Sequence, residues 1–189
     1  MKLVVIGASY GGLFALMDLL GSLTTDFPVP IAIAQHRSAQ DSDEARLGHV
    51  LSRYSALPVR DAEHLEEIRS PCVYLAPADY HLLIEGDHFE LNVDDFVQYS
   101  RPSIDVLFES AARAYGPGVA GVLLTGYGRD GTSGMTAIHK AGGRTIAEDP
   151  ETAMQPAMPR RAIDAGVVDE VLALDAIGPR LIELSKVAA

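Results

Sequence analysis

A short apolar strand, a glycine-rich turn and a helix follow one another at the start of this chain, and together they limit the folds open to it. Residues 3–6, LVVI, form a mostly β-branched run typical of a strand buried on both faces. GASYGG then breaks the run, and apolar residues recur at helical spacing at Leu13, Leu16, Met17 and Leu20. This order places Ser9 between strand and helix, in the nucleophile-elbow pattern G-x-S-x-G. The helix N-terminus would offer unpaired N–H groups to an oxyanion, so the turn indicates a serine nucleophile.

The residues of this turn argue against three other functions but leave one structural role open. A dinucleotide site would need glycine at Ser9 and an acidic residue after the second strand, where the chain has Gln35 and His36. A phosphate-binding P-loop would need Gly-Lys-Ser/Thr, and a signal peptide would not be interrupted by Gly7 and Asp18. Ser9 could also simply cap the helix. From this stretch, capping and catalysis are equally well supported.

Apolar runs and helical patterns alternate along the rest of the chain. The patterns predict strands at 30–35, 72–76, 119–124, 145–147 and 167–174, and helices near 45–51, 103–115, 135–141, 154–165 and 177–184. A polar loop is expected at 38–42, and the runs 81–84 and 89–93 around a Glu-Gly-Asp-His turn predict a β-hairpin. This alternation indicates a three-layer α/β fold: a mostly parallel, doubly wound sheet with an antiparallel hairpin addition. We expect residues 1–189 to form a single domain.

Charge and composition exclude several classes of partner. The net charge of -11 argues against nucleic acid or an anionic membrane surface as a partner. No apolar run approaches the roughly 20 residues that span a bilayer, so we expect no membrane insertion and a cytoplasmic protein. The single cysteine, Cys72, lies in an apolar run and is expected to be a buried structural thiol. We predict neither a cofactor nor a metal.

Three reactive side chains follow predicted strands, at the edge where open α/β sheets bind ligands. Ser9 follows the first strand, His36 the second, and Asp130 the strand at 119–124. A histidine can accept the proton of a serine nucleophile, and a carboxylate on its other ring nitrogen stabilises the imidazolium. These residues therefore form a candidate triad. The remaining histidines fall in helix patterns, in a charged segment or beside the hairpin (His49, His64, His81, His88, His139).

The order Ser, His, Asp differs from the Ser, acid, His order of common α/β-hydrolases. The chain does resemble the chemotaxis protein-glutamate methylesterases, the CheB type, over nearly its full length. The resemblance is carried by IGASYGG, AQH, VYLAPADYHL, RPSIDVLFESAA, GVLLTGYGRDGTSGM, AGGRTIAEDPET and MPRRAIDAG. It implies a serine hydrolase that demethylates glutamyl methyl esters on the cytoplasmic domain of chemoreceptors and deamidates certain glutamines. It also implies the triad Ser9, His36 and Asp130.

Two tyrosines depart from the pattern of the resembled family. Tyr10 stands where the family usually has threonine, and Tyr127 where it usually has methionine, in a loop thought to help form the oxyanion hole. We expect backbone N–H groups near these tyrosines to hold the oxyanion, with Gly11 and Gly128 lining the pocket. The segment Met154-Gln155-Pro156-Ala157 also replaces a usually smaller, glycine-bearing one. Two alternatives therefore stay open: a related carboxylesterase acting on another small or protein ester, and a catalytically silent binding module.

Typical members of the resembled family carry an amino-terminal receiver domain that covers the esterase cleft until it is phosphorylated. Here Met1 immediately precedes the first predicted strand, so the sequence is either a fragment or a protein without a built-in receiver. In the second case we expect activity without phosphorylation and no response to acetyl phosphate. Regulation would then require a separate protein, with a basic face suited to the charge of -11.

Overall fold

The computed structural model describes residues 1–37 and 44–186, and the polar loop predicted at 38–42 lies outside them. Seven strands form one parallel sheet in the order β3-β4-β2-β1-β7-β8-β9. Their bounds are β1 Leu3–Ala8, β2 Ile31–Gln35, β3 Val59–Asp61, β4 Val73–Leu75, β7 Val119–Leu123, β8 Arg144–Glu148 and β9 Glu170–Leu172. A separate antiparallel pair, β5 His81–Glu85 and β6 His88–Asn92, forms the predicted hairpin. The predicted fold class is confirmed.

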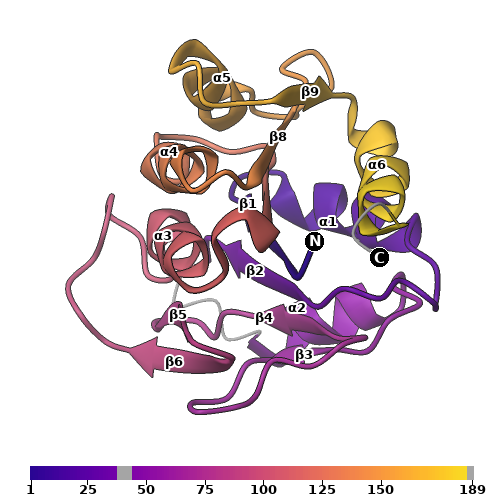
Figure 1. Ribbon diagram of the computed structural model, residues 1–189, viewed down its shortest axis with the longest axis vertical. Coiled ribbons are helices and arrows are strands. Elements are labelled where there is room, and N and C mark those ends of the chain that lie inside the picture. Colours follow the sequence, from indigo (N-terminus) through magenta and orange to yellow (C-terminus); the bar gives the residue numbers. More distant parts are fainter. Residues whose placement is uncertain (38–43, 187–189) are drawn as a thin grey trace.

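Helices cover both faces of the sheet (Figure 1). Their bounds are α1 Gly12–Gly21, α2 Glu44–Ser52, α3 Ile104–Tyr115, α4 Thr132–Lys140, α5 Ala157–Asp164 and α6 Leu174–Lys186, with a 3₁₀ turn at Gly116–Gly118. In the view of Figure 1, α3, α4 and α5 lie on one side of the sheet, and α1 and α6 lie on the other. The hairpin packs beneath α3, where the Ser110 hydroxyl accepts the Ile84 N–H at 3.1 Å.

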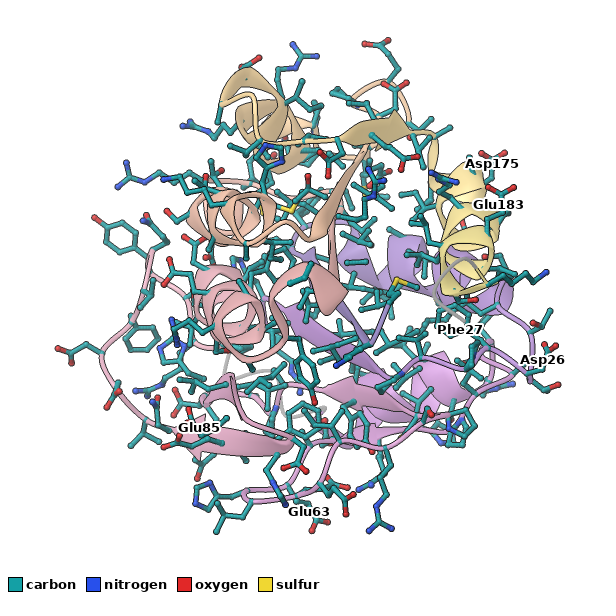
Figure 2. All side chains as sticks on the ribbon, viewed as in Figure 1. Asp26, Phe27, Glu63, Glu85, Asp175 and Glu183 are labelled. Atoms are coloured by element: carbon teal, nitrogen blue, oxygen red, sulfur yellow. The ribbon has the colours of Figure 1, made fainter. Side chains whose placement is uncertain are left out.

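Burial on both faces explains why β1 is apolar at every position. Leu3 and Val5 belong to the apolar cluster that includes residues of α3, α4 and α5. Val4 and Ile6 belong to the cluster that includes residues of α1 and α6. The labelled acidic side chains Glu63, Glu85, Asp175 and Glu183 lie instead at the periphery (Figure 2). Cys72 is buried and unpaired, as predicted.

Two parts of the prediction were wrong. The last strand is only Glu170–Leu172, and Leu174 already begins α6. Leu172 and Leu174 both pack against the same core cluster, so an unbroken apolar run here spans a strand end and a helix start. The edge strand β3 was not predicted, because three residues with two of them exposed carry no periodic signal. None of the helices in the described residues is both long and apolar enough to cross a membrane.

Candidate active site

The register of the parallel strands brings Ser9 and His36 together. β1 lies between β2 and β7, with Ala8 paired to Gln35 and Gly7 paired to Leu123. Ser9 and His36 are therefore the first residues beyond one paired position of adjacent strands. The His36 N–H continues the ladder by donating to the Ala8 carbonyl at 3.0 Å, and the Ser9 N–H donates to the Thr125 carbonyl at 3.0 Å.

The three predicted side chains form one continuous chain of contacts. The Ser9 Oγ lies 3.2 Å from His36 Nδ1, and His36 Nε2 lies 2.7 Å from Asp130 Oδ2. A carboxylate only accepts, so Nε2 carries the proton and Nδ1 presents its lone pair to Ser9. Gly11, not Ser9, occupies the N-cap position of α1, without a side-chain cap. The capping interpretation of Ser9 is thus wrong.

Asp130 is buried, yet it is held in the ionised form. Its Oδ1 accepts from the Ser103 hydroxyl and the Asp105 N–H, both at 2.9 Å, and its Oδ2 accepts from the Ile104 N–H at 2.8 Å as well as from His36. Burial by itself would raise the pKa of the Asp130 carboxyl, but the bonds from His36, Asp105 and Ile104 lower it below its usual value. The donors come from the first turn of α3, whose dipole also favours an anion there. The carboxylate can therefore stabilise a protonated His36.

A second buried carboxylate, Asp105, lies directly behind Asp130. Its Oδ1 accepts the N–H groups of Gly131 and Gly134, each at 2.8 Å, and so caps the N-terminus of α4. Burial, together with the nearby Asp130 charge, raises the pKa of Asp105 to about 6, although the two N–H bonds oppose this rise. α4 is thus anchored to α3 immediately beside Asp130.

The pocket residues predicted from the two tyrosines do lie at the site. The rings of Tyr10 and Tyr127 are tilted against each other with their centroids 5.4 Å apart, and both remain more than half exposed. Gly11 and Gly128 have left-handed backbone conformations, and the Met154 side chain packs against Gly11. Among the described residues, neither the Tyr10 N–H nor the Tyr127 N–H has a hydrogen-bond acceptor. Both remain available as oxyanion donors, a role that stays a prediction.

Glycine is required at position 126 because the chain passes very close to Ser9 there. A Cβ on Gly126 would lie 2.6 Å from the Cβ of Ser9, and it would also overlap the sulfur of Met158. The Gly126 N–H donates to the Gln155 carbonyl at 2.9 Å, which ties the loop after β7 to the segment before α5. The close contact fixes the Tyr127 loop against Ser9.

Two further residues, which were not predicted, contact Ser9 or His36. The Gln35 amide nitrogen donates to the carbonyls of Ser9 at 2.8 Å and His36 at 3.0 Å. Gln35 ends β2 directly before His36, and this position was the only feature of the sequence that could have identified it as a site residue. Ser100, in the segment between β6 and α3, places its Oγ 3.4 Å from His36 Nδ1. No pattern in the sequence identified it.

His81 lies near the site, but backbone groups contact both of its ring nitrogens, as expected for a structural histidine. It is buried, its Nδ1 accepts the Ser103 N–H at 3.2 Å, and its Nε2 lies 3.1 Å from the Asp95 carbonyl. Within the described part of the chain, no three His, Cys, Asp or Glu side chains are grouped as metal ligands would be.

Comparison with known proteins places this architecture among bacterial methylesterases. The family model described as CheB methylesterase matches residues 4–181. Protein-glutamate methylesterase/protein-glutamine glutaminase 2 of Anaeromyxobacter dehalogenans is 44% identical over 185 residues, which cover 98% of this chain and 54% of that protein. A Leptospira interrogans protein, provisionally named protein-glutamate methylesterase/protein-glutamine glutaminase, is 43% identical over 97% of this chain and 94% of its own length. The crystal structure of the Thermotoga maritima CheB methylesterase catalytic domain superposes with a TM-score of 0.93 at 37% identity, covering 97% of this chain and 98% of that one.

Proposed function

Because this chain belongs to the CheB methylesterase family, we propose that it hydrolyses glutamyl methyl esters on chemoreceptors and deamidates glutamine side chains there. Both reactions replace the group on a side-chain carbonyl, pass through tetrahedral intermediates of the same kind and give the same acyl-enzyme, so one serine site can serve both. The observation that carries the proposal is the continuous contact from Ser9 through His36 to Asp130.

In this mechanism His36 Nδ1 takes the proton of the Ser9 hydroxyl as Oγ attacks the ester carbonyl. The Asp130 carboxylate, already ionised, stabilises the imidazolium that forms. The N–H groups of Tyr10 and Tyr127 stabilise the oxyanion, and His36 then gives its proton to the departing methanol. Water hydrolyses the resulting acyl-enzyme by the same steps, with water in place of the serine hydroxyl.

The two tyrosine rings support a second candidate, a carboxylesterase of the same architecture with a different ester as substrate. Tyr10 directly follows Ser9, Tyr127 directly follows Gly126, which packs against Ser9, and the two rings are in contact, so they would shape the pocket for another ester. Release of methanol from methylated receptor distinguishes the two candidates. Hydrolysis of small esters without methanol release from the receptor would favour the second, and no turnover of either would leave a binding module.

Substitution of the triad tests the proposed mechanism. We expect Ser9→Ala to abolish hydrolysis of a chromogenic ester, because the covalent route is lost, at a cost of several orders of magnitude in rate. His36→Ala should lose nearly as much, and the double variant little more, because the two residues act as a unit. Ser52→Ala, at the exposed end of α2, is the matched control. Additive losses in the double variant, or a largely active Ser9→Ala, would refute the triad.

A further inference from the structure

A second hydroxyl reaches the base of the proposed triad. The Ser100 Oγ lies 3.4 Å from His36 Nδ1, the same ring nitrogen that faces the Ser9 Oγ at 3.2 Å. Since Nε2 donates to Asp130, Nδ1 has a single lone pair and can accept only one good hydrogen bond. The Ser100 hydroxyl is therefore not needed for the attack by Ser9.

The turn that carries Ser100 is built in an unfavourable backbone conformation. Val97 and Ser100 exchange both backbone hydrogen bonds, at 3.2 and 2.9 Å, around Gln98 and Tyr99. These central residues have φ values of +50° and +64°, the signs of a type I′ turn, which normally requires Asn or Gly. The Tyr99 side chain is 98% exposed and gains no packing in return. Strain of this kind concentrates where a side chain must be presented in one orientation.

Side-chain bonds hold this turn on both sides. Gln98 Oε1 accepts from Arg129 Nε at 2.8 Å, and Arg129 directly precedes the triad residue Asp130. On the other side, the Arg101 guanidinium binds Asp79 at 2.6 Å and the Val93 carbonyl at 2.9 Å. Ser100 itself is partly exposed.

We propose that Ser100 positions the water that hydrolyses the acyl-enzyme, an inference that rests on the proposed function. Two atoms 3.4 Å apart can both bond one water at the ordinary separation of about 2.8 Å. The water donates one proton to His36 Nδ1 and the other to the Ser100 Oγ, so its lone pair is aimed at the acyl carbon. The Ser9 Oγ cannot take this place, because at that stage it is the ester oxygen bonded to the carbon that the water attacks.

The step balances without any further reactant. The water oxygen forms the new bond to the acyl carbon, and the bond from that carbon to the Ser9 Oγ breaks. The proton taken by His36 Nδ1 passes to the Ser9 Oγ, and the product leaves as a carboxylic acid that then ionises. Ser100 gains and loses no proton, and it contributes orientation alone.

Separate measurement of acylation and deacylation tests this role. Wild type, Ser100→Ala, Ser100→Thr and the control Ser52→Ala are mixed with p-nitrophenyl acetate. The rate of the initial nitrophenol burst reports acylation, and intact mass after quenching reports loss of the acetyl group from the enzyme. We expect Ser100→Ala to leave the burst rate unchanged and to deacylate roughly three- to tenfold more slowly, as loss of one net hydrogen bond predicts. Ser100→Thr, which keeps the hydroxyl, should deacylate at close to the wild-type rate.

Several results would overturn the inference. Unchanged deacylation in Ser100→Ala would make Ser100 a turn residue only, and an equal fall of both rates would indicate general damage to the site. Faster acylation would show that Ser100 competes with Ser9 for His36. Ester hydrolysis by Ser9→Ala at close to the wild-type rate would instead refute the proposed serine esterase, and this inference with it.

Discussion

Gln35 holds the backbones of the proposed nucleophile and base at a fixed separation. Its amide donates to the carbonyls of both Ser9 and His36, at 2.8 and 3.0 Å. The side chain is buried against Gly12, where any Cβ would overlap the Gln35 Oε1. A carboxylate of the same shape has no proton to donate and would repel both carbonyls. Gln35 is thus a positioning residue, and substitutions of similar size can test this role.

We expect Gln35→Glu and Gln35→Leu to lower kcat by roughly ten- to a hundredfold on a small ester, because misplacement by about 1 Å costs rate of this order. KM should change little, since the Gln35 amide bonds only to the protein backbone. Steady-state kinetics on both variants provide the measurement, with thermal unfolding to confirm that they are folded. A folded Gln35→Leu with wild-type kcat would show that the strand register alone sets the geometry.

At the scale of the elements, two carboxylates with different partners link α3 to α4. Asp130 accepts from the first turn of α3, and Asp105, within that turn, accepts from the first turn of α4. The N-cap position of α4 is a left-handed Gly131, which has no side chain to cap the helix, so Asp105 supplies the cap from another helix. The reciprocal bonds fix the helix termini that surround Asp130.

The raised pKa of Asp105, about 6, predicts a specific pH dependence of stability. The folded state binds this proton more tightly than the unfolded chain, in which the pKa is near 3.8, so the wild type loses stability as the pH rises from about 4 to 6. Asp105→Asn keeps an oxygen for the cap and cannot ionise. Its unfolding free energy relative to wild type should therefore rise by up to roughly 3 kcal/mol between pH 4 and pH 7.

Urea unfolding of both proteins across this pH range measures the difference. Asp175→Asn, in the exposed first turn of α6, controls for the loss of one negative charge. A relative stability of Asp105→Asn that did not change with pH would show that Asp105 is already ionised at the acid end of the range.

On the scale of the whole molecule, the site depends on how closely α3 packs against α4 over one face of the sheet. A Cβ on Gly134 would overlap the Cβ of Phe108, and a Cβ on Gly121 of β7 would lie 2.6 Å from the Ile138 side chain. The two glycines let sheet and helices approach closely, so Asp130 reaches His36 from a loop above β7. Ile104, whose N–H donates to Asp130, belongs to the apolar cluster on this face.

We expect Gly134→Ala to destabilise the protein by about 1–3 kcal/mol, since overpacking forces α3 and α4 apart. Its activity should fall as well, because the same helix ends hold Asp130. Gly21→Ala is the matched control: it lies at the exposed end of α1, where the nearest contact of a Cβ is 3.5 Å away. That change should be neutral or stabilise by up to about 1 kcal/mol. Equal effects of the two substitutions on melting temperature would argue against close α3–α4 packing.

Periodicity and strand ends were sufficient to predict the fold class, the hairpin and the grouping of Ser9, His36 and Asp130 from the sequence. The physical reason is local: a buried strand has an apolar pattern, and parallel strands present their carboxyl ends at one edge. Short edge strands and a run shared by strand and helix escaped prediction, because β3 and the β9–α6 boundary have no distinct period.

Contacts between loops could come only from the tertiary arrangement. Ser100 meets His36 across 64 residues of sequence, and Asp105 caps a helix that starts 27 positions later, at Thr132. Neither contact leaves a local pattern, since each depends on how the loops fold over the sheet edge and not on the spacing of apolar residues. The orientation of the His36 ring, with Nδ1 toward Ser9, follows likewise from the placement of Asp130 by α3 and α4. Local sequence thus determined which residues meet at the edge of the sheet, whereas long-range packing determined their orientation and their additional partners.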